Sequence, residues 1–265
     1  MKESRQKPER RKKSKRAIWI YNILIVVFLG IAIYSGYRLV TDMMEDRKGS
    51  NSYEQIAEQV ALPAETTVVQ VAGQEQTILL RQIDFEALFA INPDVVAWLE
   101  CEGTIIDYPV VQGADNSYYL KHLLDGTQHR FGTLFVDKDS TPGFVDDNTI
   151  IYGHHIKAGD MFYSLKHYRE EGYYEEHPYF MLYTPEKTYR IDLFAGFLTS
   201  ANDNFYLNFG TEESFAEYIA EIRKNSTFES PVEMTPSDQM VTLYTCAYDF
   251  DEARYILCGK LVELK

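Results

Sequence analysis

Residues 240–246 read Met-Val-Thr-Leu-Tyr-Thr-Cys, a run that alternates in polarity and ends in a cysteine. Alternation with a period of two is typical of a strand that has one face in a core. Val241 and Leu243 then share the more apolar face, while Tyr244 and Cys246 share the other. The pattern therefore predicts a cysteine at a strand end, where a substrate can reach its sulfur.

Two residues elsewhere in the chain complete a possible catalytic set around Cys246. A thiol attacks a carbonyl only as the thiolate, so it needs a neighbouring base or cation. His154 ends the run Ile-Ile-Tyr-Gly-His, and such a base lies near its cysteine in space rather than in sequence. Arg254, eight residues after the cysteine, carries a fixed charge and a fork of N–H donors for a developing oxyanion. The set predicts acyl transfer by a cysteine nucleophile.

Other interpretations of these residue types stay open. His155 follows His154 directly and competes with it for the role of base. Asp249 and Asp251 could orient the imidazole or the guanidinium, although solvated turn residues are the favoured interpretation. Cys101 and Cys258 are expected to be small buried hydrophobes, and the sequence does not decide whether they pair. With three cysteines, an exported chain keeps at least one free thiol.

The N-terminal segment predicts a membrane anchor. Residues 1–16 carry nine Lys or Arg against two Glu, and residues 17–37 contain no charged side chain. A helix of this length spans about 30 Å, the thickness of the hydrocarbon core. The basic flank keeps the N-terminus in the cytoplasm, so we predict a single-pass protein of the cell membrane with an extracytoplasmic catalytic domain. The alternative is a cleaved signal peptide, which a run this long and a poor cleavage site disfavour.

The charge balance and the ligand spacing exclude several function classes. Removing the +7 of residues 1–16 from the chain's −14 leaves −21 on residues 38–265, which argues against a nucleic-acid partner. The sequence has no Cys-x-x-Cys, and its acidic pairs 146–147 and 175–176 lack the spacing of a calcium loop. We therefore predict no metal and no cofactor.

The rest of the chain predicts a mostly β domain after a helical stalk. Apolar residues at helical spacing indicate a helix that Pro63 ends, and Asp84 is a plausible N-cap for a second helix. A short helical turn is expected at 93–98. Many strands with few crossovers favour an antiparallel barrel or closed sheet with peripheral helices. The candidate strands are 104–111, 132–137, 149–153, 179–183, 188–197, 240–245 and 254–264, and the later helices are 160–168 and 211–224.

Three segments resemble class B sortases, the membrane-anchored cysteine transpeptidases of Gram-positive bacteria. They are 107–113 with 116–120, 148–155 with 161–162, and 242–246 with 253–254. The resemblance covers about residues 84–264 and implies an eight-stranded sortase β-barrel with peripheral helices. The implied organisation is a cytoplasmic basic stub at 1–16, a transmembrane anchor at 17–37, an extracytoplasmic helical stalk at 38–83 and a catalytic domain at 84–265.

The resemblance also implies roles for the site residues. Cys246 would be the nucleophile, His154 the general acid/base and Arg254 the oxyanion or positioning group, with Tyr244 and Thr245 contacting the substrate. Members of the class cleave a surface protein's C-terminal sorting signal after Thr, through a thioester acyl-enzyme.

The implied substrates are surface proteins with signals such as Asn-Pro-x-Thr or (Ser/Pro)-Pro-x-Thr-Gly, and the implied acceptor is an amine of a peptidoglycan precursor. Two departures bear on specificity: Tyr244 stands where Ser is common, and His155 where Asn is common. A pilin-polymerising sortase and a non-catalytic, membrane-tethered binding domain of the same fold remain the alternatives.

Overall fold

The computed structural model describes residues 15–71, 74–156, 158–247, 249 and 251–264. Their contacts divide the chain into two compact units, residues 1–48 and 49–265. Most of the predicted basic stub lies outside the described residues.

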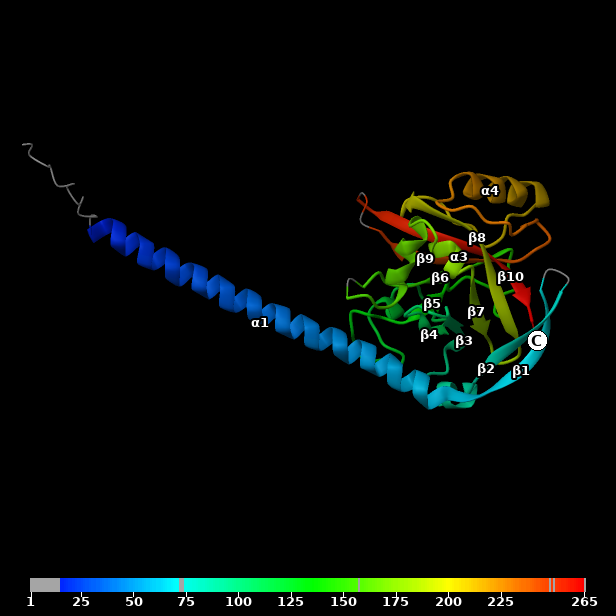
Figure 1. Cartoon of the computed structure of the whole chain (residues 1–265), viewed down its shortest axis with the longest axis horizontal. Coiled ribbons are helices and arrows are strands. Elements are labelled where there is room, and N and C mark those ends of the chain that lie inside the picture. The colour runs from blue at the N-terminus through cyan, green and yellow to red at the C-terminus, as the bar shows by residue number, and fades with distance from the viewer. Residues whose placement is uncertain (1–14, 72–73, 157, 248, 250, 265) are drawn as a thin grey trace, which may run out of the picture. The chain divides into compact units, whose positions relative to one another are not determined.

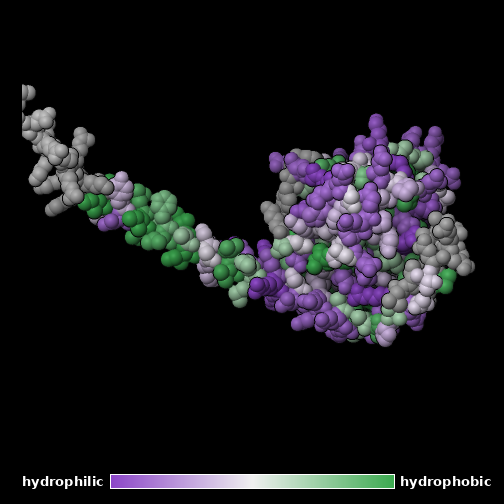
Figure 2. Space-filling model, in the orientation of Figure 1, coloured by the Kyte–Doolittle hydropathy of each residue, from purple (hydrophilic) through white to green (hydrophobic). Residues whose placement is uncertain are grey.

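The first helix, α1, runs from Lys15 to Val60 and contains the uncharged segment 17–37. It is long and apolar enough to cross a membrane, with a mean hydropathy of 2.2 over its most apolar window. Figure 2 shows apolar side chains gathered along this part of the helix. The helix is therefore a candidate membrane span.

The end of α1 belongs to the second unit, where it packs on the barrel. Tyr53, Ile56 and Val60 are buried in the main core cluster, as their helical spacing predicts. The chain then forms a hairpin of β1 (Ala61–Val71) and β2 (Gln74–Ile83), which the sequence analysis did not foresee within the stalk. β-Branched residues are frequent in β1, and extended structure favours them.

Eight strands form a closed barrel in the order β10-β8-β7-β3-β4-β5-β6-β9, which confirms the predicted fold class (Figure 1). Two pairs, β4–β5 and β6–β9, are parallel, and the others are antiparallel. The strands are β3 Val95–Glu100, β4 Asp107–Val111, β5 Leu134–Val136, β6 Asn148–Tyr152, β7 Tyr179–Tyr183, β8 Thr188–Ser200, β9 Met240–Cys246 and β10 Ala253–Glu263.

The helical turn expected at 93–98 is wrong, because this segment becomes strand β3. It pairs with β4 on one side and β7 on the other, and Trp98 and Leu99 are fully buried. The run was too short for its period to separate a strand from a helix. Pairing with two distant strands decides its conformation.

Five helical segments accompany the barrel within the described part of the second unit. Asp84 caps the first of them, as predicted, by accepting a hydrogen bond from the Ala87 amide at 2.9 Å. Figure 1 shows the longest, α4, lying against the barrel near β8. They are α2 Phe85–Ile91, η1 Tyr118–Leu120, η2 Phe162–Arg169, α3 Tyr173–Glu176 and α4 Glu212–Lys224, where η marks a 3-10 helix.

The two faces of β9 meet different surroundings. Val241 and Leu243 lie in the core of the barrel, as the alternation predicts. Met240 lies in a second cluster, which joins the outer face of the barrel to Phe215 and Ile219 of α4. Tyr244 and Cys246 follow on the same outer face and are only partly buried, so the strand delivers the cysteine to the surface.

Candidate active site

Cys246 and Arg254 stand directly opposite each other on the antiparallel strands β9 and β10. Side chains of directly opposed residues share one face, with Cβ atoms about 5 Å apart. The pairing register therefore places the Arg254 and Cys246 side chains on the same face of the sheet.

His154 reaches the same place from β6, which pairs in parallel with β9. Tyr152 is in register with Tyr244, and the Gly153 amide donates to the Tyr244 carbonyl at 3.0 Å. β6 ends two residues before His154, so the parallel pairing directs the chain at His154 toward the end of β9 that carries Cys246. The register thus pairs Arg254 with Cys246 directly and leads the chain at His154 toward the same end of β9.

A backbone carbonyl fixes the orientation of the His154 ring. Its Nε2 lies 2.7 Å from the carbonyl oxygen of Leu120. A carbonyl only accepts, so Nε2 carries the proton, and in the neutral ring Nδ1 is the nitrogen that can take one up. Sequence reasoning did not identify this partner. The sequence feature that could have indicated this partner is the 116–120 segment. Leu120 ends helix η1, and Asp115 accepts hydrogen bonds from two amides at the start of that helix.

The glycine before the histidine is required for space. A Cβ added at Gly153 would collide with the side chains of Phe162 on η2 and Leu134 on β5. The Phe162 amide also donates to the His154 carbonyl at 2.9 Å. Close packing at the end of β6 therefore holds the histidine backbone in position.

Arg254 is partly buried, with 19% of its side chain exposed. It donates to the Ala253 carbonyl at 3.0 Å and pairs with Glu252 at 3.3 Å. The guanidinium carbon lies 5.9 Å from the centre of the Tyr244 ring, a distance suited to a cation–π contact. The loop acids Asp249 and Asp251 are absent from these contacts, and Glu252 is the carboxylate that the sequence analysis missed.

The two predicted substrate-contacting residues differ in their accessibility. Tyr244 is partly buried between the rings of Tyr152 and Phe205, and burial raises the pKa of its phenol. The Thr245 side chain is buried and donates to the Gly153 carbonyl at 2.8 Å, so it cannot contact a substrate from the surface. Because residues alternate along β9, its hydroxyl instead ties the cysteine strand to the histidine strand.

A cavity of about 300 Å³ opens beside the cysteine on the side of η2. Asp249 does not orient the histidine or Arg254: its two oxygens accept from Arg169 at 3.0 and 2.8 Å. This ion pair ties the loop after Cys246 to η2. The cavity is lined by His155, Lys166, Arg169, Cys246, Ala247, Asp249 and Tyr255.

The other two cysteines are remote from this chemistry. Cys101 and Cys258 are both buried and unpaired. Burial raises the pKa of the Cys101 thiol to about 11 and that of Cys258 to about 12. Among the described residues, no three His, Cys, Asp or Glu side chains gather as metal ligands would.

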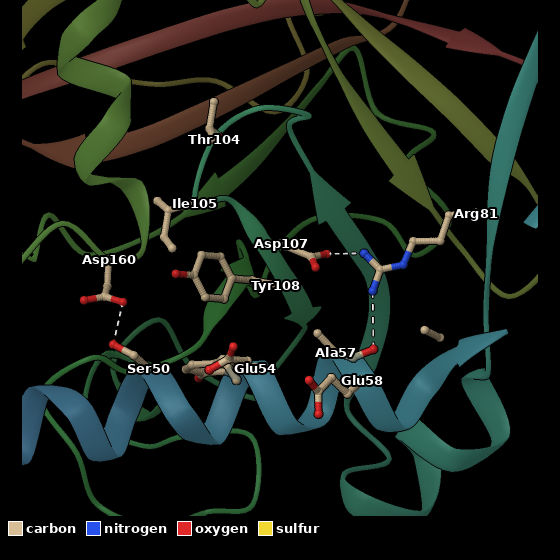
Figure 3. Close-up of a pocket in the computed structure, with 12 residues that line it drawn as sticks. Ser50, Glu54, Ala57, Glu58, Arg81, Thr104, Ile105, Asp107, Tyr108 and Asp160 are labelled. Carbon is tan, nitrogen blue, oxygen red and sulfur yellow. Dashed lines mark hydrogen bonds and ion pairs between the residues drawn. The ribbon is translucent and has the colours of Figure 1, made fainter.

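A larger cavity, of about 560 Å³, lies between the end of α1 and strand β4 (Figure 3). The Ser50 hydroxyl donates to Asp160 at 2.7 Å on one side of it, and Arg81 donates to Asp107 on the other. Asp160 belongs to the segment that follows His154. The end of α1 therefore supports the loop that carries the histidine.

The comparisons with known proteins agree with this geometry. A family model described as the sortase domain matches residues 99–262. The chain belongs to the sortase family. It is 31% identical to sortase B of Listeria monocytogenes, over 90% of this chain and 95% of that protein.

Solved structures extend the likeness to the fold and specify class B. Sortase B from B. anthracis in complex with AAEK1 matches with a TM-score of 0.71 and 27% identity, covering 83% of this sortase and 99% of that chain. A Staphylococcus aureus sortase B–substrate complex matches with a TM-score of 0.70 and 26% identity, covering 84% of this sortase and 100% of that chain. The chain is thus a sortase B-type cysteine transpeptidase.

Proposed function

We propose that Cys246 is the nucleophile of this sortase, His154 its general acid/base and Arg254 its oxyanion donor. The observation that carries the assignment is the double register of β9. Arg254 on its antiparallel partner is in register with Cys246, and its parallel partner β6 ends two residues before His154, which supports the assignment. These two neighbours supply the base and the fixed positive charge that a thiol nucleophile requires.

The first half-reaction forms the acyl-enzyme. Nδ1 of His154 first takes the proton of the Cys246 thiol, which gives a thiolate–imidazolium pair. The thiolate then attacks the carbonyl carbon of the scissile Thr, and Arg254 donates to the oxygen on which charge develops. As the tetrahedral intermediate collapses, the C–N bond breaks and the leaving amine takes a proton from Nδ1 of His154. The product is a thioester between the Thr carbonyl and the cysteine sulfur.

The proposed donor substrates are surface proteins with a C-terminal signal of the Asn-Pro-x-Thr or (Ser/Pro)-Pro-x-Thr-Gly type. A solved relative, the staphylococcal substrate complex, supports a peptide ligand for this fold. On this chain Tyr244 lies next to the cysteine on the outer face of β9. We propose that its ring borders the bound signal, so it shapes the sequence preference.

The proposed acceptor is an amine of a peptidoglycan precursor, which resolves the thioester and attaches the protein to the cell wall. A pilin lysine is the alternative acceptor. The chain has no long N-terminal lid segment with an Asp-Pro-aromatic element, which favours the cell-wall amine.

We further propose that residues 17–37 anchor the enzyme in the cell membrane with residues 1–16 in the cytoplasm. The apolar helix and its basic flank support this orientation. The stalk at 38–83 then leads to an extracytoplasmic catalytic domain at 84–265.

A peptide carrying the sorting signal tests the assignment. Cys246→Ala is expected to lose more than about 1,000-fold in kcat/KM and to form no thioester adduct by mass spectrometry, because no other described thiol is accessible. Circular dichroism should show an unchanged fold. Full turnover by this variant would show that Cys246 is not the nucleophile.

The choice between the two histidines needs its own pair of variants. His154→Gln should lose nearly as much activity as Cys246→Ala, since nucleophile and base act as one unit. His155→Gln is the matched comparison. A severe loss in the second and near-normal activity in the first would reverse the assignment of the base.

A further inference from the structure

The cavity beside Cys246 has a positive charge that the cleavage reaction does not require. Lys166 and Arg169 on η2 both line it, together with His155. Its one lining carboxylate, Asp249, is held by both terminal nitrogens of Arg169. Even when His155 is neutral, no carboxylate among the described lining residues remains to balance the positive charge of Lys166.

Lys166 is held close to the cavity by an aromatic ring. Its Nζ lies 3.6 Å from the centre of the Tyr163 ring, and the same ring packs on His155 at 4.9 Å between centroids. Among the ion pairs formed by the described residues, none uses Lys166. A partly buried ammonium group next to a nucleophile favours the binding of a ligand that carries an anionic group.

The cavity does not include Tyr244, the residue that we propose borders the sorting signal. Tyr244 precedes Cys246 on β9, whereas the cavity is lined by Ala247 and Asp249, which follow it. After the thioester has formed and the departing peptide has left, the cavity gives an acceptor amine access to the acylated cysteine. The departing peptide continues beyond the cleaved bond, so its backbone next to the cysteine is neutral and has no carboxylate. Binding of this peptide therefore does not account for a lysine in the cavity.

We infer that the preferred acceptor is an amine that carries a carboxylate within a few bonds, and that Lys166 binds this carboxylate. The inference rests on the proposed function, because it assigns the second substrate of the same site. Arg169 contributes by pairing with Asp249, so this carboxylate does not neutralise Lys166. Lys166 is thus a specificity residue for the acceptor.

The transfer step follows from this placement. The neutral amine nitrogen attacks the thioester carbonyl carbon and forms a C–N bond, while the C–S bond breaks and sulfur keeps the electron pair as thiolate. The proton released by the nitrogen passes to Nδ1 of neutral His154. The products are an amide and a thiolate–imidazolium pair, ready for the next signal peptide.

The test measures transpeptidation by the full-length enzyme with two acceptors that differ only in charge, Gly-Gly and its C-terminal amide. The wild-type enzyme is expected to favour Gly-Gly by about tenfold in kcat/KM for the acceptor, the scale of one charge-assisted contact. Lys166→Gln should bring this ratio close to one, and Lys166→Arg should keep most of it. The wild-type preference should also fall as salt is raised, because screening weakens the contact.

Lys224→Gln, a charge loss at an exposed position of α4, is the matched control and should keep the wild-type ratio. A wild-type ratio near one, or a ratio that Lys166→Gln leaves unchanged, would overturn the inference. Acyl-enzyme formation, followed by mass spectrometry in every variant, separates this failure from failure of the proposed function. If the wild-type enzyme forms no thioester, the catalytic assignment falls, and the acceptor assignment falls with it.

Discussion

The three cysteines differ because each meets a different environment. Cys258 points from β10 into the cluster beneath α4, and Cys101 lies at the end of β3 beside Tyr168. Both thiols lose hydration on folding, which disfavours the charged thiolate. Cys246 alone combines partial exposure with a cavity and an opposing guanidinium.

Alkylation at pH 8 should therefore be selective. With pKa values of about 11 and about 12, Cys101 and Cys258 hold at most about one thiolate in a thousand at this pH, and burial blocks the reagent. Iodoacetamide is expected to label Cys246 alone in the folded protein and all three thiols in urea, as read by peptide mass spectrometry. Cys246→Ala is the control and should stay unlabelled when folded. Equal labelling of Cys101 would show that the described burial is incorrect.

At the scale of elements, the junction of β6 with η2 governs the position of the histidine. Gly153 is the point of closest approach, where a side chain has no room beside Phe162 and Leu134. A catalytic group displaced by about 1 Å can lose about 100-fold in rate. Packing inside the barrel therefore affects the position of the histidine through Gly153.

We expect Gly153→Ala to lose at least about tenfold in kcat with a smaller change in KM, because the strand end must shift and carry His154 with it. Overpacking should also lower the free energy of unfolding by about 1–3 kcal/mol, measured by urea denaturation.

Gly36→Ala is the comparison for that change, since an added Cβ there meets nothing within 4 Å. It should leave both quantities unchanged. Wild-type kcat in Gly153→Ala would mean that the histidine does not depend on this packing.

At the scale of the whole molecule, the folded unit is larger than the barrel. It begins at Gly49, and the last turns of α1 bury Tyr53, Ile56 and Val60 against the barrel core. The Tyr53 hydroxyl also hydrogen-bonds Thr133 at 2.9 Å. The end of α1 therefore contributes to the stability of the catalytic domain.

Two truncations test this dependence. A protein that starts at Gly49 should unfold at the same urea concentration as residues 49–265 do within the full-length protein. A protein that starts at Ala61 loses three buried side chains and should be less stable by about 5 kcal/mol. Equal stability of the two truncated proteins would mean that the end of α1 only spaces the domain from its anchor.

Sequence periodicity alone was enough to predict the elements whose pattern is local. The uncharged run 17–37 determined a long apolar helix, and the alternation in β9 determined which face carries Cys246. The resemblance of three motifs then indicated the sortase barrel and the residues proposed for catalysis. Such features are local because helix and strand periods are properties of the backbone.

Only the tertiary structure decided the rest. Strand β3 depends on partners far away in sequence, and the Leu120 carbonyl reaches His154 from another loop. Asp249, for which a solvated turn position was favoured, instead pairs with Arg169. Thr245 became a link between strands rather than a substrate contact. These outcomes depend on which segments meet when the barrel closes, and no local pattern encodes such long-range pairing.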